Sequence, residues 1–284
     1  MAADTGVVQA GGDGSGRPST ATRVVTDGAA DLPPGAPAVA VVRGPVHVGG
    51  RAWDGDPGRF WAGIGAGQEL PATEAPSVEQ LTAAYTGAGE VLAVHVSSEL
   101  SRTVVHARQA AAAVRSPVRV VDSRSLSVGT GLVVMAAAEA VAAGVDGDRL
   151  AGMVEGWVDQ LHVHAVIDDV RFLVNGGRAG LVGPGAGHHA RRRVVAVKGH
   201  VIPIRQVRHR DEAIGELVGH AREHAAGGVT RWAVGHGDAA DVGEFVERMI
   251  AVFGSGPSYV TLLGPPVGAH MGPRALVVGF FSGA

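Results

Sequence analysis

Short apolar runs alternate with amphipathic stretches along most of the chain. A run such as Val91 to Val96 is typical of a buried strand, whereas apolar residues at every third or fourth position indicate a helix. Strands are predicted from Val24-Val25-Thr26 onward. Helix starts recur between them, as at Ser77, where Gln80 completes a capping box. This alternation predicts an α/β fold with parallel-rich sheets flanked by helices.

The length of the chain suits two domains. Its 284 residues exceed one typical core, and the pattern breaks near residues 158–163. We expect an N-terminal α/β domain over residues 23–160 and a C-terminal α/β domain over residues 161–284. Residues 1–22 carry few large apolar groups and are predicted to be a flexible N-terminal tail.

Composition narrows the class of protein. The net charge is −3, which lacks the basic surplus of a nucleic-acid-binding surface. The chain has no cysteine, which excludes disulfides, thiolate metal sites and a cysteine nucleophile. The best candidate for a membrane span, Leu126 to Ala143, contains two glycines and Glu139, so we interpret it as a buried helix. The N-terminus lacks the pattern of a signal peptide, and a cytoplasmic location is expected.

Polar residues follow several predicted strands, where α/β sheets bind ligands. They are Asp27, Ser97-Ser98, Asp122-Ser123, Asp168 and His236. The turn Ser97 to Ser101 also lies at a helix start, where free N–H groups favour an anion. Serine is equally a preferred helix cap, so an anion site and a simple cap both stay open at this point.

Six segments resemble, in the same order, motifs of the DegV family of bacterial lipid-binding proteins. They are Val24 to Pro33 (similar to TDSTADLP), Pro71 to Ser77 (TSQPS), Ser97 to Ala107 (SSGLSGTYQSA), Val120 to Ser123 (VIDS), Phe172 to Arg178 (YLKKGGRI) and Gly268 to Pro273 (GAHTGPG). Each motif is weak alone, but six in the right order with fitting spacing are specific.

The resemblance implies a two-domain DegV-like (EDD) fold with a ligand site near the domain interface. It implies a non-catalytic subunit, without cofactor or metal, that binds a long-chain fatty acid. Such a subunit presents the carboxylate to a separate ATP-binding fatty acid kinase subunit. The residues implied for the site are those that hold the carboxylate, Thr73, Ser97, Ser98 and His270, and those at the mouth of the pocket, Arg178 and Asp27.

The chain departs from the family pattern close to these residues. The replacements are Gly28 for serine, Glu99 and Arg102 for glycines, Met271 for threonine and Arg274 for glycine. Glu99 beside a carboxylate site would be repulsive unless it points to solvent or pairs with Arg102.

The same residues also suggest two other kinds of protein. Ser97, His270 and either Asp27 or Asp122 could form the triad of a serine hydrolase acting on an acyl ester, but the chain has no G-x-S-x-G elbow. A carrier of another anionic or apolar ligand is a further alternative. The glycine run at residues 183–188 fails the G-x-G-x-x-G pattern, and no Walker A sequence is present, which disfavours a nucleotide enzyme.

Histidine pairs are the remaining candidate for chemistry. His162 and His164 share one face of a predicted strand, and His220 and His224 share one face of a predicted helix. The glutamate of the H-E-x-x-H motif is missing from the second pair, so we interpret these residues as surface histidines.

Overall fold

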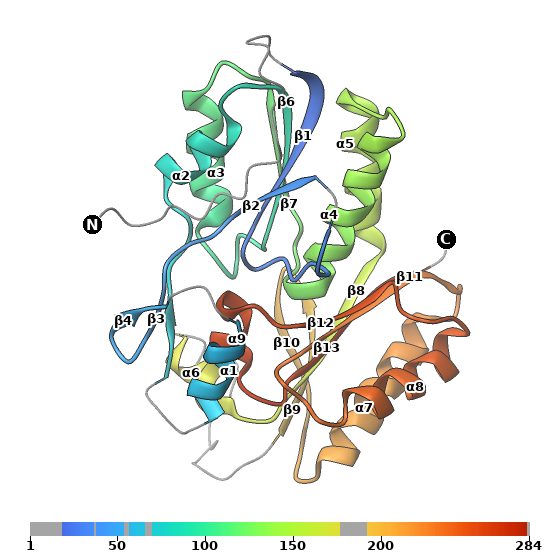
Figure 1. Ribbon diagram of the computed structural model, residues 1–284. Helices are drawn as coiled ribbons and strands as arrows, with labels where there is room; N and C mark the ends of the chain where they lie inside the picture. Colours follow the sequence, from blue (N-terminus) through green and yellow to red (C-terminus); the bar gives the residue numbers. More distant parts are fainter. Residues whose placement is uncertain (1–18, 37, 54–56, 66–69, 177–191, 283–284) are drawn as a thin grey trace.

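The first sheet is built from apolar strands of the N-terminal half. The computed structural model describes residues 19–36, 38–53, 57–65, 70–176 and 192–282. Four parallel strands lie in the order β2-β1-β6-β7 (Figure 1). Their bounds are β1 Ser19–Asp27, β2 Val39–Val42, β6 Ala88–His95 and β7 Val118–Asp122. Strand β1 thus begins at Ser19, before the predicted strand at Val24, and residues 1–18 of the predicted tail lie outside the described residues.

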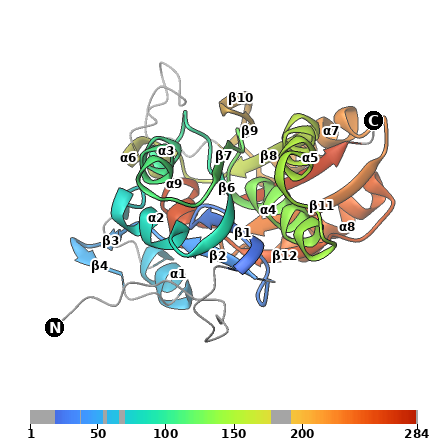
Figure 2. The ribbon, with the colours of Figure 1, turned by 90° about the horizontal axis from the view of Figure 1, so that it is seen from above.

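Helices cover both faces of this sheet (Figures 1 and 2). One face packs against α2 and α3, and the other against α4. The bounds are α2 Val78–Tyr85, α3 Thr103–Ala113, α4 Ser127–Ala142 and α5 Gly147–Gln160. The capping box predicted at the start of α2 is confirmed, because the Ser77 hydroxyl accepts from the Gln80 amide and the Gln80 side chain accepts from the Ser77 amide.

The second sheet is mixed, in the order β10-β9-β8-β13-β11-β12. Only β11 and β12 pair in parallel, and the other four pairings are antiparallel. The bounds are β8 Leu161–Ile167, β9 Arg192–Lys198, β10 His200–Val207, β11 Val229–His236, β12 Tyr259–Leu262 and β13 Leu276–Ser282. The α/β class is confirmed. Parallel pairing dominates only the first sheet, and in the second the tight turn at Gly199 (φ 78°) makes β9 and β10 an antiparallel hairpin.

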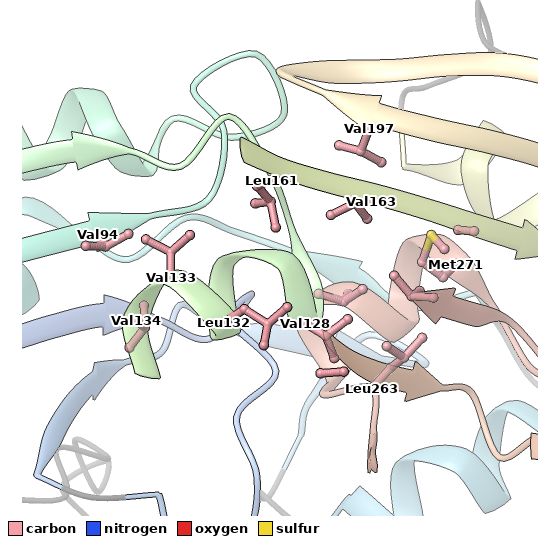
Figure 3. Packing of buried hydrophobic residues seen from close by; sticks show 14 of the residues in the cluster. Val94, Val128, Leu132, Val133, Val134, Leu161, Val163, Val197, Leu263 and Met271 are labelled. Carbon is pink, nitrogen blue, oxygen red and sulfur yellow. The ribbon is translucent and has the colours of Figure 1, made fainter. Parts of the chain in front are cut away.

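Helix α4 forms the centre of the hydrophobic core. Helices α7 (Arg210–His224) and α8 (Val242–Phe253) cover the far face of the second sheet, and α4 packs against its near face. Figure 3 shows Val133 of α4 near Val94 of β6, with Val163 and Val197 of the second sheet on the other side. The prediction of a buried helix here is confirmed. No helix among the described residues is long and apolar enough to cross a membrane.

Short elements between the sheets position the candidate site. They are β3 Val46–Val48, β4 Arg51–Ala52, β5 Ala72–Thr73, α1 Pro57–Gly65, α6 Val170–Asn175 and α9 Pro265–Met271. Strands β4, β3 and β5 form a small antiparallel sheet. Helix α9 lies against α6 and β5, which brings the end of the chain to the segment around Thr73.

Candidate ligand-binding site

A cavity of about 670 Å³ lies where the ends of β1 and β6 meet α9. This volume is within the range of small-molecule pockets. Much of its wall is apolar, and the side chains that provide this surface are Leu100, Leu126, Leu173, Val201, Val267 and Met271. They come from both halves of the chain, so a ligand in the cavity would contact both.

Thr73 and His270 form a polar pair in the wall of the cavity. The Thr73 hydroxyl lies 2.9 Å from Nε2 of His270, and both residues are half-buried. Thr73 ends β5, and His270 lies in the last turn of α9, so the packing of these two elements brings together residues far apart in the sequence. The two groups can turn toward an anion, since a hydroxyl and an imidazole N–H both donate hydrogen bonds.

In the turn Ser97 to Ser101, the first two serine hydroxyls bind other protein groups and do not point freely into the cavity. Ser97 is 1% exposed, and its hydroxyl donates to the carbonyl of Gly199 in the β9–β10 turn. The hydroxyl of Ser98 is exposed and donates to Asp122 at 2.5 Å. Ser98 borders the cavity, whereas Ser97 is not among the described residues that line it. A carboxylate that bound Ser97 would have to displace its bond to Gly199.

Asp27 borders the cavity, but its carboxylate already has three hydrogen-bond partners. Its carboxylate accepts from the amides of Ala29 and Val96 at 2.8 and 3.0 Å. It also lies 3.0 Å from Nδ1 of His95, whose Nε2 contacts the hydroxyl of Tyr85. Asp27 therefore fixes the ends of β1 and β6. Arg178, the other residue predicted at the mouth, lies outside the described residues.

Two further polar residues at the cavity were missed by the sequence analysis as ligand contacts. Arg102 is the one Arg or Lys among the described residues that line it. His106 also lines it, and its Nδ1–H donates to the carbonyl of Pro76 at 2.8 Å, which orients the ring. The available signal was spacing, because Arg102, Thr103 and His106 lie on one face of the first turn of α3.

Glu99 lines the cavity, but its carboxylate lies toward solvent and the second sheet. Its side chain is 63% exposed, and its carboxylate lies 3.4 Å from Nδ1 of His200. Glu99 therefore points to solvent, which is the first of the two arrangements expected to avoid repulsion of a bound carboxylate. The partner is His200 of the second sheet, and not Arg102.

The geometry does not assemble the triad of a serine hydrolase. The hydroxyl of Ser97 donates to a backbone carbonyl, and Nε2 of His270 contacts Thr73. Asp27 contacts His95, and Asp122 accepts from Ser98. A triad needs the nucleophile, base and acid in hydrogen-bond sequence, which these residues do not form.

Asp31 joins the two halves of the chain beside the cavity. Its carboxylate accepts from the Ser127 hydroxyl at the start of α4 and from the Gly264 amide before α9, both at 2.6 Å. Its carbonyl accepts from the hydroxyl of Tyr259. The residue is 5% exposed, and burial raises the pKa of its carboxyl to about 7, although the two hydrogen bonds act in the opposite direction.

A cavity between two sheets, with a polar pair in an apolar wall, defines an α/β protein built around a ligand-sized pocket. Residues 21–283 match the sequence model of the DegV family of uncharacterised proteins. The chain therefore belongs to the DegV family, and the resemblance drawn from the six motifs is confirmed.

Relatives of known sequence and structure agree with this membership. A DegV domain-containing protein of Deinococcus radiodurans is 32% identical over 72% of this chain and 77% of the relative. One from Streptomyces coelicolor is 31% identical over 69% and 71%. A solved DegV family protein of Thermus thermophilus, described as binding fatty acid, is similar with a TM-score of 0.81 at 25% identity over 92% of this chain and 99% of that chain. DegV of Bacillus subtilis, described as a fatty acid binding protein, shares the fold with a TM-score of 0.82 at 22% identity over 92% and 99%.

Proposed function

We propose that the cavity binds one long-chain fatty acid, with the carboxylate held at Thr73 and His270. The observation that carries this proposal is the placement of that polar pair in the wall of a largely apolar cavity of about 670 Å³. The match to the fatty acid-binding protein of Thermus thermophilus supports the same ligand class.

The energetics favour an amphipathic ligand. Each buried methylene contributes about 0.8 kcal/mol, so a chain of about fourteen methylenes contributes roughly 11 kcal/mol before the costs of association. The carboxylate needs donors, because burying an unpaired charge is very costly. Thr73, His270 and the amides at the start of α3 supply donors, and Arg102 adds a positive charge at the rim.

The same proposal includes the predicted contacts of Ser97 and Ser98 with the fatty acid carboxylate. Ser98 borders the cavity, and Ser97 would reach the carboxylate by exchanging its present acceptor, Gly199. Asp27 and Arg178 keep their proposed place at the mouth, where Asp27 holds the strand ends in position.

We further propose that the chain is non-catalytic and works in the cytoplasm with a separate kinase subunit. A head group held by one hydroxyl and one imidazole stays more accessible than one clamped by a bidentate arginine. In a mixture with a bacterial fatty acid kinase subunit, ATP and oleate, ADP release should require the lipid-loaded chain. ADP release that is independent of this chain would contradict the partnership.

The ligand proposal is tested by native mass spectrometry of the purified protein, followed by analysis of its organic extract. We expect one fatty acid per chain, and a higher melting temperature when oleate or palmitate is added to delipidated protein.

Thr73→Val and His270→Gln should each weaken oleate binding about tenfold or more, since each removes a hydrogen bond to a charged group. Thr230→Val, at an exposed position on β11, is the matched control. Protein that carries no lipid and gains no stability from either fatty acid would refute the proposal.

A further inference from the structure

Four histidines meet between the second sheet and α7. Strand β8 directs His162 and His164 to the face covered by α7, while Leu161, Val163 and Ala165 face the core around α4. Helix α7 supplies His220 and His224, one turn apart. The ring of His224 lies 4.8 Å from that of His162 and 5.2 Å from that of His164, measured between centroids. One ring nitrogen from each of these three residues lies within 4.8 Å of the others.

His164 shows that this cluster is more than a set of surface histidines. The side chain is 2% exposed, and neither ring nitrogen has a hydrogen-bond partner among the described residues. The interpretation of His164 as a surface residue is therefore wrong. A buried polar group without a partner costs free energy, so the site favours a group that could accept the lone pair of the imidazole.

The neighbouring histidines already have the outer contacts that metal ligands use. Nδ1–H of His224 donates to the backbone carbonyl of His220 at 2.8 Å, which leaves Nε2 with its lone pair. Nε2 of His162 lies 3.2 Å from the hydroxyl of Ser282, which leaves Nδ1 for a further partner. Metal-ligating histidines commonly use their second nitrogen in this way, because that bond fixes the tautomer and the orientation of the ring.

The two histidines of β8 lie in a poorly solvated setting. Burial lowers the pKa of His162 to about 4 and that of His164 to about 3, and the neighbouring histidines lower both further. Lys198 also lowers the pKa of His162, while Glu223 lies 3.4 Å from His220 at the exposed edge. Both shifts reflect how little solvent reaches the two rings.

We propose that His162, His164 and His224 form a binding site for a divalent transition metal ion, of which Zn²⁺ is the test case. Imidazole ligands suit zinc, copper, nickel and iron, and three histidines leave a fourth position for water or His220. Zinc–nitrogen bonds of about 2.1 Å bring tetrahedral ligand atoms to about 3.4 Å from each other, so the three nitrogens must approach. The exposed end of α7 at His224 gives the ion access and can make this adjustment.

The proposed metal site is independent of the lipid site. Alternate residues of β8 face opposite sides of the sheet, so the histidines and the core beside the cavity lie on different faces. A bound ion would link the C-terminal end of α7 to β8. Loss of the ion should leave fatty acid binding unchanged, and the two proposals can fail separately.

The test uses the full chain purified without a histidine tag and treated with a chelator. Calorimetric titration with Zn²⁺ should give one ion per chain, and Zn²⁺ should raise the melting temperature. Substitution with Co²⁺ should give the intense visible bands of a tetrahedral site. Because His224 is exposed, His224→Gln should fold normally while weakening Zn²⁺ binding by about 100-fold or more.

A buried variant and a matched control complete the experiment. His164→Leu should abolish the stoichiometric ion while leaving the metal-free protein at least as stable, because it removes an unsatisfied polar group. His209→Gln changes an exposed histidine at the other end of α7 and should bind Zn²⁺ like the unaltered chain. The proposal is overturned if the unaltered chain binds no stoichiometric Zn²⁺, or if His224→Gln binds it as tightly as His209→Gln does.

Discussion

Asp31→Asn isolates the effect of one buried carboxyl on stability. In the folded protein the pKa of Asp31 is raised to about 7 from 3.8, mainly by burial. Asparagine has nearly the same shape. Its amide oxygen can accept from the Gly264 amide and its NH₂ group can donate to the Ser127 hydroxyl, so both contacts of the carboxylate can be replaced.

The direction of the pH effect follows from the raised pKa. Between about pH 4 and pH 7 the folded chain keeps a proton on Asp31 that the unfolded chain has released. The contribution of Asp31 to stability is therefore largest below pH 4, falls as the pH rises, and is lost above pH 7. A shift of about three units corresponds to about 4 kcal/mol over this window. In the asparagine variant this fall should disappear.

The assay is urea unfolding followed by circular dichroism at pH 4.5, 6 and 8. The stability of Asp31→Asn relative to the unaltered chain should rise by several kcal/mol from the lowest to the highest pH. Asp211→Asn, at an exposed position in the first turn of α7, is the control and should show no such rise. If the two variants follow the same pH dependence within about 1 kcal/mol, the buried carboxyl does not have the role assigned to it.

Three further substitutions test separate features of the packing, each by urea unfolding. Ser77→Ala removes the capping box with Gln80 and should cost about 1 kcal/mol, and an unchanged midpoint would contradict the cap. Arg210→Met removes the charged hydrogen bonds to Asp241 and Asp168, although Asp168 keeps Arg192 and Arg274 as partners, and should cost about 1.5–3 kcal/mol at neutral pH, so an unchanged stability would show that the pairs are dispensable. Gly131→Ala places a methyl group 2.5 Å from the hydroxyl of Tyr259 and should cost about 1–3 kcal/mol. Alanine at half-buried Gly219 meets no atom within 4 Å and serves as its control, so equal stability of the two variants would contradict the close approach.

Local sequence patterns predicted most of the fold. The run Val91 to Val96 and the stretch 126–143 became a buried strand and a buried helix, because burial of apolar residues needs no knowledge of the partner. The residue at which a helix begins is harder to predict than the helix itself. Asp146 and Asp148 are equally good caps for α5 by composition, and only the structure shows that Asp146 occupies the N-cap position.

Partners distant in the sequence could not be predicted from local patterns. Helix α9 begins with two prolines followed by small residues, so it has no apolar periodicity, and its existence depends on packing against α6 and β5. The acceptor of Ser97 is a carbonyl about a hundred residues away. His164 was read as exposed because the sequence indicates which face of a strand a residue occupies, but not that a helix covers that face.

Helix α4 makes the two halves of the molecule depend on each other. Its side chains complete the core of the first sheet and that of the second, so neither half has a core of its own on that side. A fragment ending at residue 160 would keep α4 but leave exposed the apolar surface that β8, β11 and β13 cover. The halves should therefore melt in a single calorimetric transition, and the separated fragments should aggregate unless they are mixed so that they can reassociate.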